Sequence, residues 1–154
     1  MANLGIAYRD GRGIAKDEAE AVKWFRQASD QGNTNAAGHL GFMYESGRGV
    51  AKDEIEAVKW YRQGAEKGDP TSMRRLARMY AAGRGTAKDE IKAKEWLGAA
   101  LIVYRRSAEQ ENASALENLG EMYELGHGVA KDEKAAAEWY RKAIAAGGPG
   151  APGT

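Results

Sequence analysis

Apolar residues along the chain recur at intervals of three and four, which is the spacing of one face of an α-helix. In one stretch they include Leu40 and Tyr44, followed by Ala57, Trp60 and Tyr61. These segments lack the strict alternation of apolar and polar residues that predicts a half-buried β-strand. The pattern therefore predicts an all-α chain in which turns separate successive amphipathic helices.

The helical pattern repeats with a fixed period. Four tyrosines mark it, each followed 16 residues later by a tryptophan: Tyr8, Tyr44, Tyr80 and Tyr123, with Trp24, Trp60, Trp96 and Trp139. The first three members of each series are 36 residues apart, and the fourth follows after 43, so the third repeat is extended by 7 residues. The strings GRGIAKDE, GRGVAKDE, GRGTAKDE and GHGVAKDE recur at 11–18, 47–54, 83–90 and 126–133. Such a period is typical of a solenoid, in which each unit buries its apolar face against the next.

Capping residues predict two helices in each repeat. The first helix should begin at Asn33, Asp69 or Asn112 and end at Gly11, Gly47, Gly83 or Gly126, where glycine tolerates a left-handed conformation. The second helix should begin at Asp17, Asp53, Asp89 or Asp132. We expect a single domain over 1–146, with repeats at about 1–32, 33–68, 69–111 and 112–146, and a flexible Gly/Pro tail at 147–154.

The repeated positions resemble the Sel-one-like repeat (SLR), a relative of the tetratricopeptide repeat (TPR). The segment 40–68, LGFMYESGRGVAKDEIEAVKWYRQGAEKG, is similar to the consensus of that repeat over nearly its whole length, and the resemblance covers residues 2–146. It implies a right-handed α-solenoid of about four antiparallel helix pairs. It also implies a protein-binding adaptor or scaffold and no common reaction.

The seven extra residues of the third repeat are LGAALIV, at 97–103. Seven residues make about two helical turns and rotate the helix phase by only ~20°, so the fourth repeat can still dock. One interpretation is a longer second helix. A second is a contact patch for self-association formed by Leu97, Leu101 and Val103, and a third is a loop.

Composition excludes several classes of function. The chain has 23 Lys and Arg against 22 Asp and Glu, and a net charge of +1 gives no broad field to attract nucleic acid or an anionic membrane. The absence of cysteine excludes disulfides, thiolate zinc sites and a cysteine nucleophile. Without a signal-peptide pattern or an apolar run of about 20 residues, we expect no membrane insertion, and the cytoplasm is favoured although the localisation stays open.

Candidate catalytic residues are few. His39 and His127 lie in different repeats, and no ligand spacing suggests a metal site. We expect His39 at the surface and His127 in an exposed turn. Each Gly-x-Gly follows a helix, unlike the phosphate-binding loops that follow a strand. We therefore expect neither an enzyme nor a cofactor.

Binding residues are expected on the first helix of each repeat, which lines the concave surface in two-helix solenoids. The candidates are its positions that do not repeat: Asn35, His39, Phe42, Thr71, Arg75, Arg78, Asn118 and Glu121. Phe42 would be an apolar anchor, Arg75 and Arg78 would donate to a carboxylate, and Asn118 would pair with a peptide backbone. The alternative for both arginines is that they are solvated charges that aid solubility.

These residues favour a noncatalytic scaffold that binds a peptide segment in the concave groove. An acidic or C-terminal segment beside an apolar residue would suit the candidates. The alternative is a self-assembling structural module, a homo-oligomer that uses exposed end faces and the 97–103 insertion.

Overall fold

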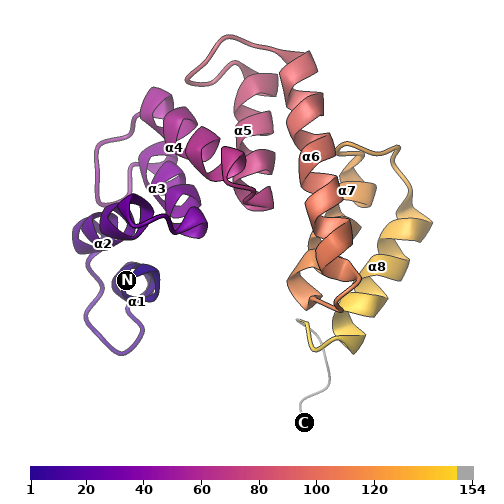
Figure 1. The fold of residues 1–154 in the computed structure, drawn as a ribbon, viewed down its shortest axis with the longest axis horizontal. Helices are drawn as coiled ribbons and strands as arrows, with labels where there is room; N and C mark the ends of the chain where they lie inside the picture. The colour runs from indigo at the N-terminus through magenta and orange to yellow at the C-terminus, as the bar shows by residue number, and fades with distance from the viewer. Residues whose placement is uncertain (149–154) are drawn as a thin grey trace. The chain divides into compact units, whose positions relative to one another are not determined.

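The computed structural model describes residues 1–148, and its regular elements are all α-helices (Figure 1). In chain order they are α1 (Ala2–Asp10), α2 (Glu18–Asp30), α3 (Thr34–Ser46), α4 (Glu54–Glu66), α5 (Pro70–Ala82), α6 (Glu90–Ala108), α7 (Ala113–Leu125) and α8 (Glu133–Ala145). This order confirms the prediction of two helices in each of four repeats. Residues 149–154, which make up most of the predicted tail, lie outside the described residues.

The predicted caps fix the helix ends. Asn33, for example, precedes α3, and its side chain accepts a hydrogen bond from the Ala36 amide at 3.0 Å. Gly47 ends that helix with φ +70°, a left-handed conformation that costs glycine little. The corresponding glycines that end α1, α5 and α7 have φ between +66° and +71°. Side-chain caps therefore start α3, α5 and α7, and left-handed glycines end these three helices.

Helices within a repeat approach closely because a glycine of the first helix faces an aromatic ring of the second. A Cβ atom on Gly41 would lie 2.5 Å from the ring of Tyr61, which is fully buried between α3 and α4. Gly5 with Phe25, and Gly120 with Tyr140, make the same kind of contact. The repeated glycine and the repeated aromatic residue are thus two halves of one packing contact.

The chain forms two compact units, one over Met1–Ala93 and the other from Lys94 onward. In the first unit α3 packs against α4 and α5, and in the second α7 packs against α8. The seven extra residues of the third repeat belong to α6, an unbroken helix of 19 residues. The structure therefore confirms a longer second helix and excludes a loop at 97–103.

None of the helices in the described part of the chain combines the length and the apolar character needed to cross a bilayer.

Candidate partner-binding face

Two neighbouring helices of the first unit carry most of the predicted binding residues. His39 and Phe42 lie on α3, and Arg75 and Arg78 occupy the same two positions of the repeat on α5. Because α3 and α5 are in contact, these four residues belong to one face of the first unit, which we call the α3/α5 face. Residues that are 36 positions apart in the sequence therefore lie on helices that contact each other.

Phe42 is half-buried on this face. Its ring packs against a buried cluster formed by Ala21, Val22, Phe25, Leu40 and Met43. The guanidinium carbon of Arg75 lies 5.0 Å from the centre of the Phe42 ring, and that of Arg48 lies 5.7 Å away. Guanidinium groups at this distance are attracted by the ring quadrupole. Phe42 therefore joins the core of the first unit to the arginines of the face.

Glu45 lies one turn beyond Phe42 and organises the arginines. Its carboxylate accepts hydrogen bonds from the Tyr61 hydroxyl at 2.6 Å, from Arg78 at 2.8 Å and from Arg84 at 3.2 Å. A nitrogen of Arg75 lies 3.8 Å from the same carboxylate. Only 8% of Glu45 is exposed, so these contacts operate in a weakly screened environment.

The neighbours of Glu45 set its charge state. Burial by itself raises the pKa of Glu45, but the Tyr61 hydrogen bond and the positive charges of Arg78, Arg84 and Arg75 outweigh burial, so the pKa of Glu45 lies below its ordinary value. Burial, and after it the hydrogen bond to the same carboxylate, raises the pKa of the Tyr61 hydroxyl. Glu45 is thus an ionised acceptor at neutral pH and Tyr61 is a neutral donor.

The positive charge of the face is only partly balanced. Arg84 also binds Glu54 at 2.7 Å, so Arg75, Arg78 and Arg84 share two carboxylates. The side chain of Arg78 remains 57% exposed, and its contact with Glu45 uses one of its nitrogens. Lys52 also pairs with Glu54 at 3.2 Å, so the cations of this cluster outnumber its two carboxylates, and Arg78 is the most exposed of its arginines.

His39 differs from the expectation of a surface residue. It is half-buried, its ring stacks on Phe25 with 4.7 Å between ring centres, and its Nδ1 lies 3.2 Å from a guanidinium nitrogen of Arg9. Burial and the charge of Arg9 lower the pKa of His39 to about 4. His39 therefore links α1, α2 and α3 as a neutral ring, and its packing on Phe25 is a contact that periodicity along α3 does not reveal.

Glu45 is the residue of this face that the sequence analysis missed. At the same first-helix position the other repeats have Arg9, Ala81 and Glu124, so this position varies along the chain. That variation, three residues after Phe42 on the same helix face, is the signal that could have found Glu45.

The other predicted site residues are spread over both units. Asn35 and Thr71 are exposed near the first turns of α3 and α5. Asn118 and Glu121 lie on α7 in the second unit, where the Asn118 side-chain amide donates to the Ser114 carbonyl oxygen at 2.7 Å. In the insertion, Leu97 and Val103 are half-buried and Leu101 is buried, whereas Ile102 between them is 71% exposed. The α3/α5 face therefore brings together predicted binding residues from two helices of one unit, whereas Asn118 and Glu121 share the single helix α7.

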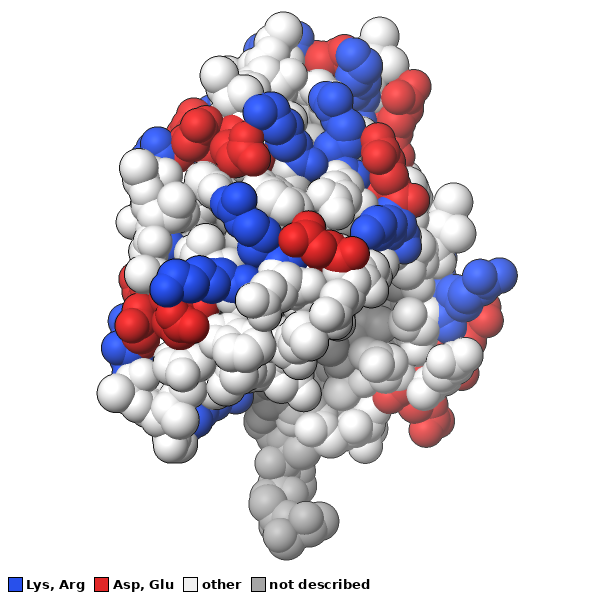
Figure 2. Space-filling model, turned by 60° about the vertical axis from the view of Figure 1, so that its left-hand side comes forward, with Lys and Arg blue, Asp and Glu red and all other residues white. Residues whose placement is uncertain are grey.

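Charges are mixed on the surface shown in Figure 2. Lys and Arg side chains alternate with Asp and Glu side chains over the upper part of the view, and uncharged residues dominate the lower part. Within residues 1–148, no three His, Asp or Glu side chains are grouped so that they could hold a metal ion.

Helix pairs that recur along the chain with a period of 36 residues define the class of helical-repeat proteins. The family model of the Sel1 repeat matches residues 1–33, 34–69, 70–101 and 113–148. The chain belongs to the Sel1 repeat family. Proteins of this family are generally noncatalytic scaffolds for protein–protein interaction and typically bind other proteins.

Solved structures share the fold. The chain is similar to c5321, a protective antigen of uropathogenic Escherichia coli with an SLR fold, at 37% identity and a TM-score of 0.63, covering 96% of this chain and 30% of that one. A Sel1 repeat protein from Oxalobacter formigenes is 33% identical with a TM-score of 0.57, covering 94% of this chain and 56% of that one. Cysteine-rich protein B of Helicobacter pylori is 25% identical with a TM-score of 0.53, covering 55% of this chain and 63% of that one.

These similarities confirm the predicted family and the α-solenoid class. The chain spans less than two thirds of the length of each of the three solved proteins. A comparison with curated protein sequences finds no match.

Proposed function

We propose that this chain is a noncatalytic scaffold that binds a peptide segment of a partner protein on the α3/α5 face. The observation that carries the proposal is the arrangement of Phe42, Arg75 and Arg78 around the buried carboxylate of Glu45. The half-buried ring of Phe42 and the exposed guanidinium of Arg78 are carried by two packed helices. This pairing suits an acidic or C-terminal segment with an apolar residue beside its carboxylate.

Arg78 would bind the carboxylate of the partner. Its guanidinium has five N–H donors, and the contact with Glu45 leaves donors for a second carboxylate. Because Glu45 and its neighbours already fix the arginines, less side-chain entropy is lost when a partner binds. Glu45 therefore acts as a positioning residue for the face.

Phe42 and Arg75 would receive the apolar part of the segment. The ring is seated on the core of the first unit, and Arg75 lies against it, so the two make a rigid surface of mixed character. Aromatic and arginine side chains in this kind of setting carry much of the binding energy at protein interfaces.

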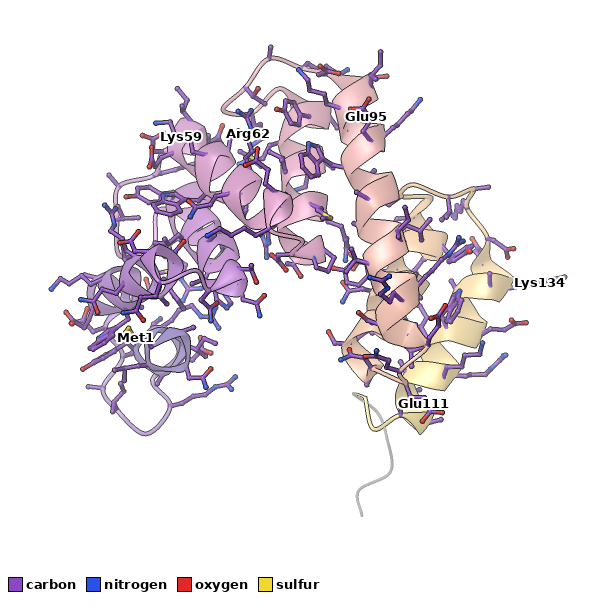
Figure 3. All side chains as sticks on the ribbon, in the orientation of Figure 1. Met1, Lys59, Arg62, Glu95, Glu111 and Lys134 are labelled. Carbon is purple, nitrogen blue, oxygen red and sulfur yellow. The ribbon has the colours of Figure 1, made fainter. Side chains whose placement is uncertain are left out.

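The test is affinity capture from a lysate of the source cell. The native chain is compared with a Phe42→Ala, Arg75→Gln, Arg78→Gln triple variant, in which glutamine is chosen because a glutamate would lie beside Glu45 and repel it. The control is Lys23→Gln, Lys59→Gln, which removes the same charge from α2 and α4 at side chains that are 70% and 66% exposed (Figure 3 labels Lys59).

We expect a partner that the native chain and the control retain and that the triple variant loses, while circular dichroism shows that all three chains are equally helical. A partner retained equally by all three would contradict binding on this face.

Self-association is a second candidate function, favoured by one contact that recurs between repeats. An arginine of α2, α4 and α6 donates to the tyrosine hydroxyl of the first helix that follows: Arg26 to Tyr44 at 2.6 Å, Arg62 to Tyr80 at 2.8 Å and Arg105 to Tyr123 at 2.7 Å. Arg141, exposed on α8, and Tyr8, half-buried on α1, carry the same residue types. A second copy could join Arg141 to Tyr8 in the same way.

Sedimentation velocity over a range of concentrations tests this candidate. The sedimentation coefficient of the native chain should rise with concentration, and Arg141→Glu should abolish the rise. A native chain that stays monomeric at the highest concentration would exclude the candidate.

A further inference from the structure

A pocket of about 740 Å³ opens in the second unit among the C-terminal end of α6, α7 and α8. Trp139 and Tyr123 form an aromatic wall, with ring centres 6.5 Å apart and planes inclined by 26°. Leu116 and Ala108 add apolar surface to the lining. The pocket has the size and the mixed lining of sites that hold a side chain or a small ligand.

A hydrogen bond of the first unit has no counterpart at this pocket. At the corresponding place in the first unit, Gln63 of α4 donates a hydrogen bond at 3.2 Å to the hydroxyl of Ser29 on α2. The repeat register puts Lys142 at the position of Gln63 and Ala108 at the position of Ser29. Because alanine has no side-chain acceptor, this bond cannot join α6 to α8.

The two basic residues of the pocket, Lys142 and Arg105, each contact an aromatic residue of its wall. The ammonium group of Lys142 lies 4.4 Å from the centre of the Trp139 ring. Arg105 donates to the Tyr123 hydroxyl at 2.7 Å. The Trp139 ring thus already holds an ammonium group supplied by the chain itself.

The two acidic residues of the pocket differ from the basic ones in their contacts. Glu109 and Glu111 are exposed in the lining, at the end of α6 and just beyond it (Figure 3 labels Glu111). Within residues 1–148, the structure shows no hydrogen bond or ion pair made by either carboxylate. The unused groups of the pocket are therefore negatively charged, and they lie in the same lining as a ring that attracts cations.

We propose that this pocket binds a lysine or arginine side chain from a basic segment of a partner protein. The cation of that side chain would displace the Lys142 ammonium from the Trp139 ring and would pair with Glu109 and Glu111. Its aliphatic stem would cover Leu116 and Ala108. This site lies in the other unit from the α3/α5 face and selects the opposite charge, so it does not depend on the proposed function.

Nuclear magnetic resonance titration tests the site. The probes are acetylated and amidated pentapeptides of sequence Gly-Ala-X-Ala-Gly, where X is lysine, arginine, norleucine or glutamate. The signal is the indole N–H resonance of Trp139, assigned with a Trp139→Phe variant. We expect saturable shifts with the lysine and arginine peptides in the millimolar range, and at least about fivefold weaker binding of norleucine, which has a similar stem and no charge.

Three variants separate the contributions. Glu109→Gln should weaken binding of the lysine peptide about two- to fivefold. Glu111→Gly should do the same without loss of fold, because Glu111 has φ +53° where the equivalent residues of other repeats are Gly32, Gly68 and Gly147. Lys142→Met should instead strengthen binding, because it removes the competing ammonium group and keeps an apolar stem.

Three results would overturn the proposal. One is equal or tighter binding of the glutamate peptide, which would make the pocket an anion site of Arg105 and Lys142. Another is the absence of any saturable shift of Trp139 at millimolar peptide. The third is weaker binding by Lys142→Met, which would show that Lys142 contacts the ligand directly.

Discussion

Replacing Gly41 with alanine should destabilise the first unit. The new methyl carbon would lie 2.5 Å from two ring carbons of Tyr61, whereas carbon atoms in contact are optimally about 3.5–4.0 Å apart. The Tyr61 ring cannot easily retreat, because it is fully buried and its hydroxyl donates to Glu45 at 2.6 Å. The extra methyl group therefore strains the packing of α3 on α4.

The size of the stability change in Gly41→Ala follows from two opposing effects, overpacking and helix propensity. Overpacking a well-packed core costs about 1–3 kcal/mol, and the short distance places this case near the upper end. Replacing glycine by alanine inside a helix gains about 1 kcal/mol. We therefore expect Gly41→Ala to lower the free energy of unfolding by about 2 kcal/mol.

Gly98 provides the matched control. It also lies inside a helix, α6, but a Cβ atom there meets nothing within 4 Å. Gly98→Ala should therefore raise the free energy of unfolding by about 1 kcal/mol, through helix propensity alone. Urea unfolding followed by far-ultraviolet circular dichroism measures both variants.

A double-mutant cycle isolates the contact. In a Tyr61→Ala background the ring is absent, so Gly41→Ala should no longer cost stability and should gain the helix-propensity term. If Gly41→Ala raises the stability of the otherwise native chain as much as Gly98→Ala does, the glycine–tyrosine packing argument is wrong.

Three further changes test other parts of the structure. Burial and the charge of Arg9 lower the pKa of His39 from 6.5 to about 4, so as pH falls the unfolded chain binds a proton at His39 before the folded chain does. The free energy of unfolding should therefore fall as pH drops from 6.5 to about 4. His39→Gln should flatten this pH dependence in urea titrations. In thermal unfolding, Asp69→Ala should lower the free energy of unfolding by about 2 kcal/mol and Asp132→Ala by about 1 kcal/mol. The difference arises because the Asp69 cap is buried and the Asp132 cap is exposed. Trp60→Ala should lower the free energy of unfolding by about 3–5 kcal/mol, because it leaves a cavity. Trp60→Phe should lower it by less than half of that, because phenylalanine keeps a ring and removes a buried indole N–H that has no partner among the described residues.

Much of the fold could be predicted because its signals are local. A cap such as Asn33 or Gly47 is decided by contacts within about four residues, and the period of 36 then repeats that decision along the chain. The insertion at 97–103 was harder to interpret, because seven apolar residues suit an extended helix and an exposed patch equally well in sequence. Its backbone proved helical, and its side chains range from buried Leu101 to exposed Ile102.

The candidate site could be predicted only in part, because its electrostatics are tertiary. The stripe of unrepeated positions identified Phe42 and Arg75, which lie on adjacent helices. The convergence of three arginines on Glu45 was not visible, because these arginines are 30 to 39 positions away in sequence and reach it only through the packing of α5 and its following loop on α3. The burial of His39 was missed for the same reason, since its partner ring belongs to α2.

The measurement that tests the central claim most directly is the dissociation constant of the captured partner, once purified, for three chains by isothermal titration calorimetry. These are the native chain, the Phe42→Ala, Arg75→Gln, Arg78→Gln variant, and the Lys23→Gln, Lys59→Gln control. Loss of an aromatic anchor and two arginine donors should cost at least about 3 kcal/mol, so the triple variant should bind at least ~100-fold more weakly, with the control within about twofold of the native chain. Equal affinity of all three folded chains would contradict the account and would exclude the α3/α5 face as the binding surface.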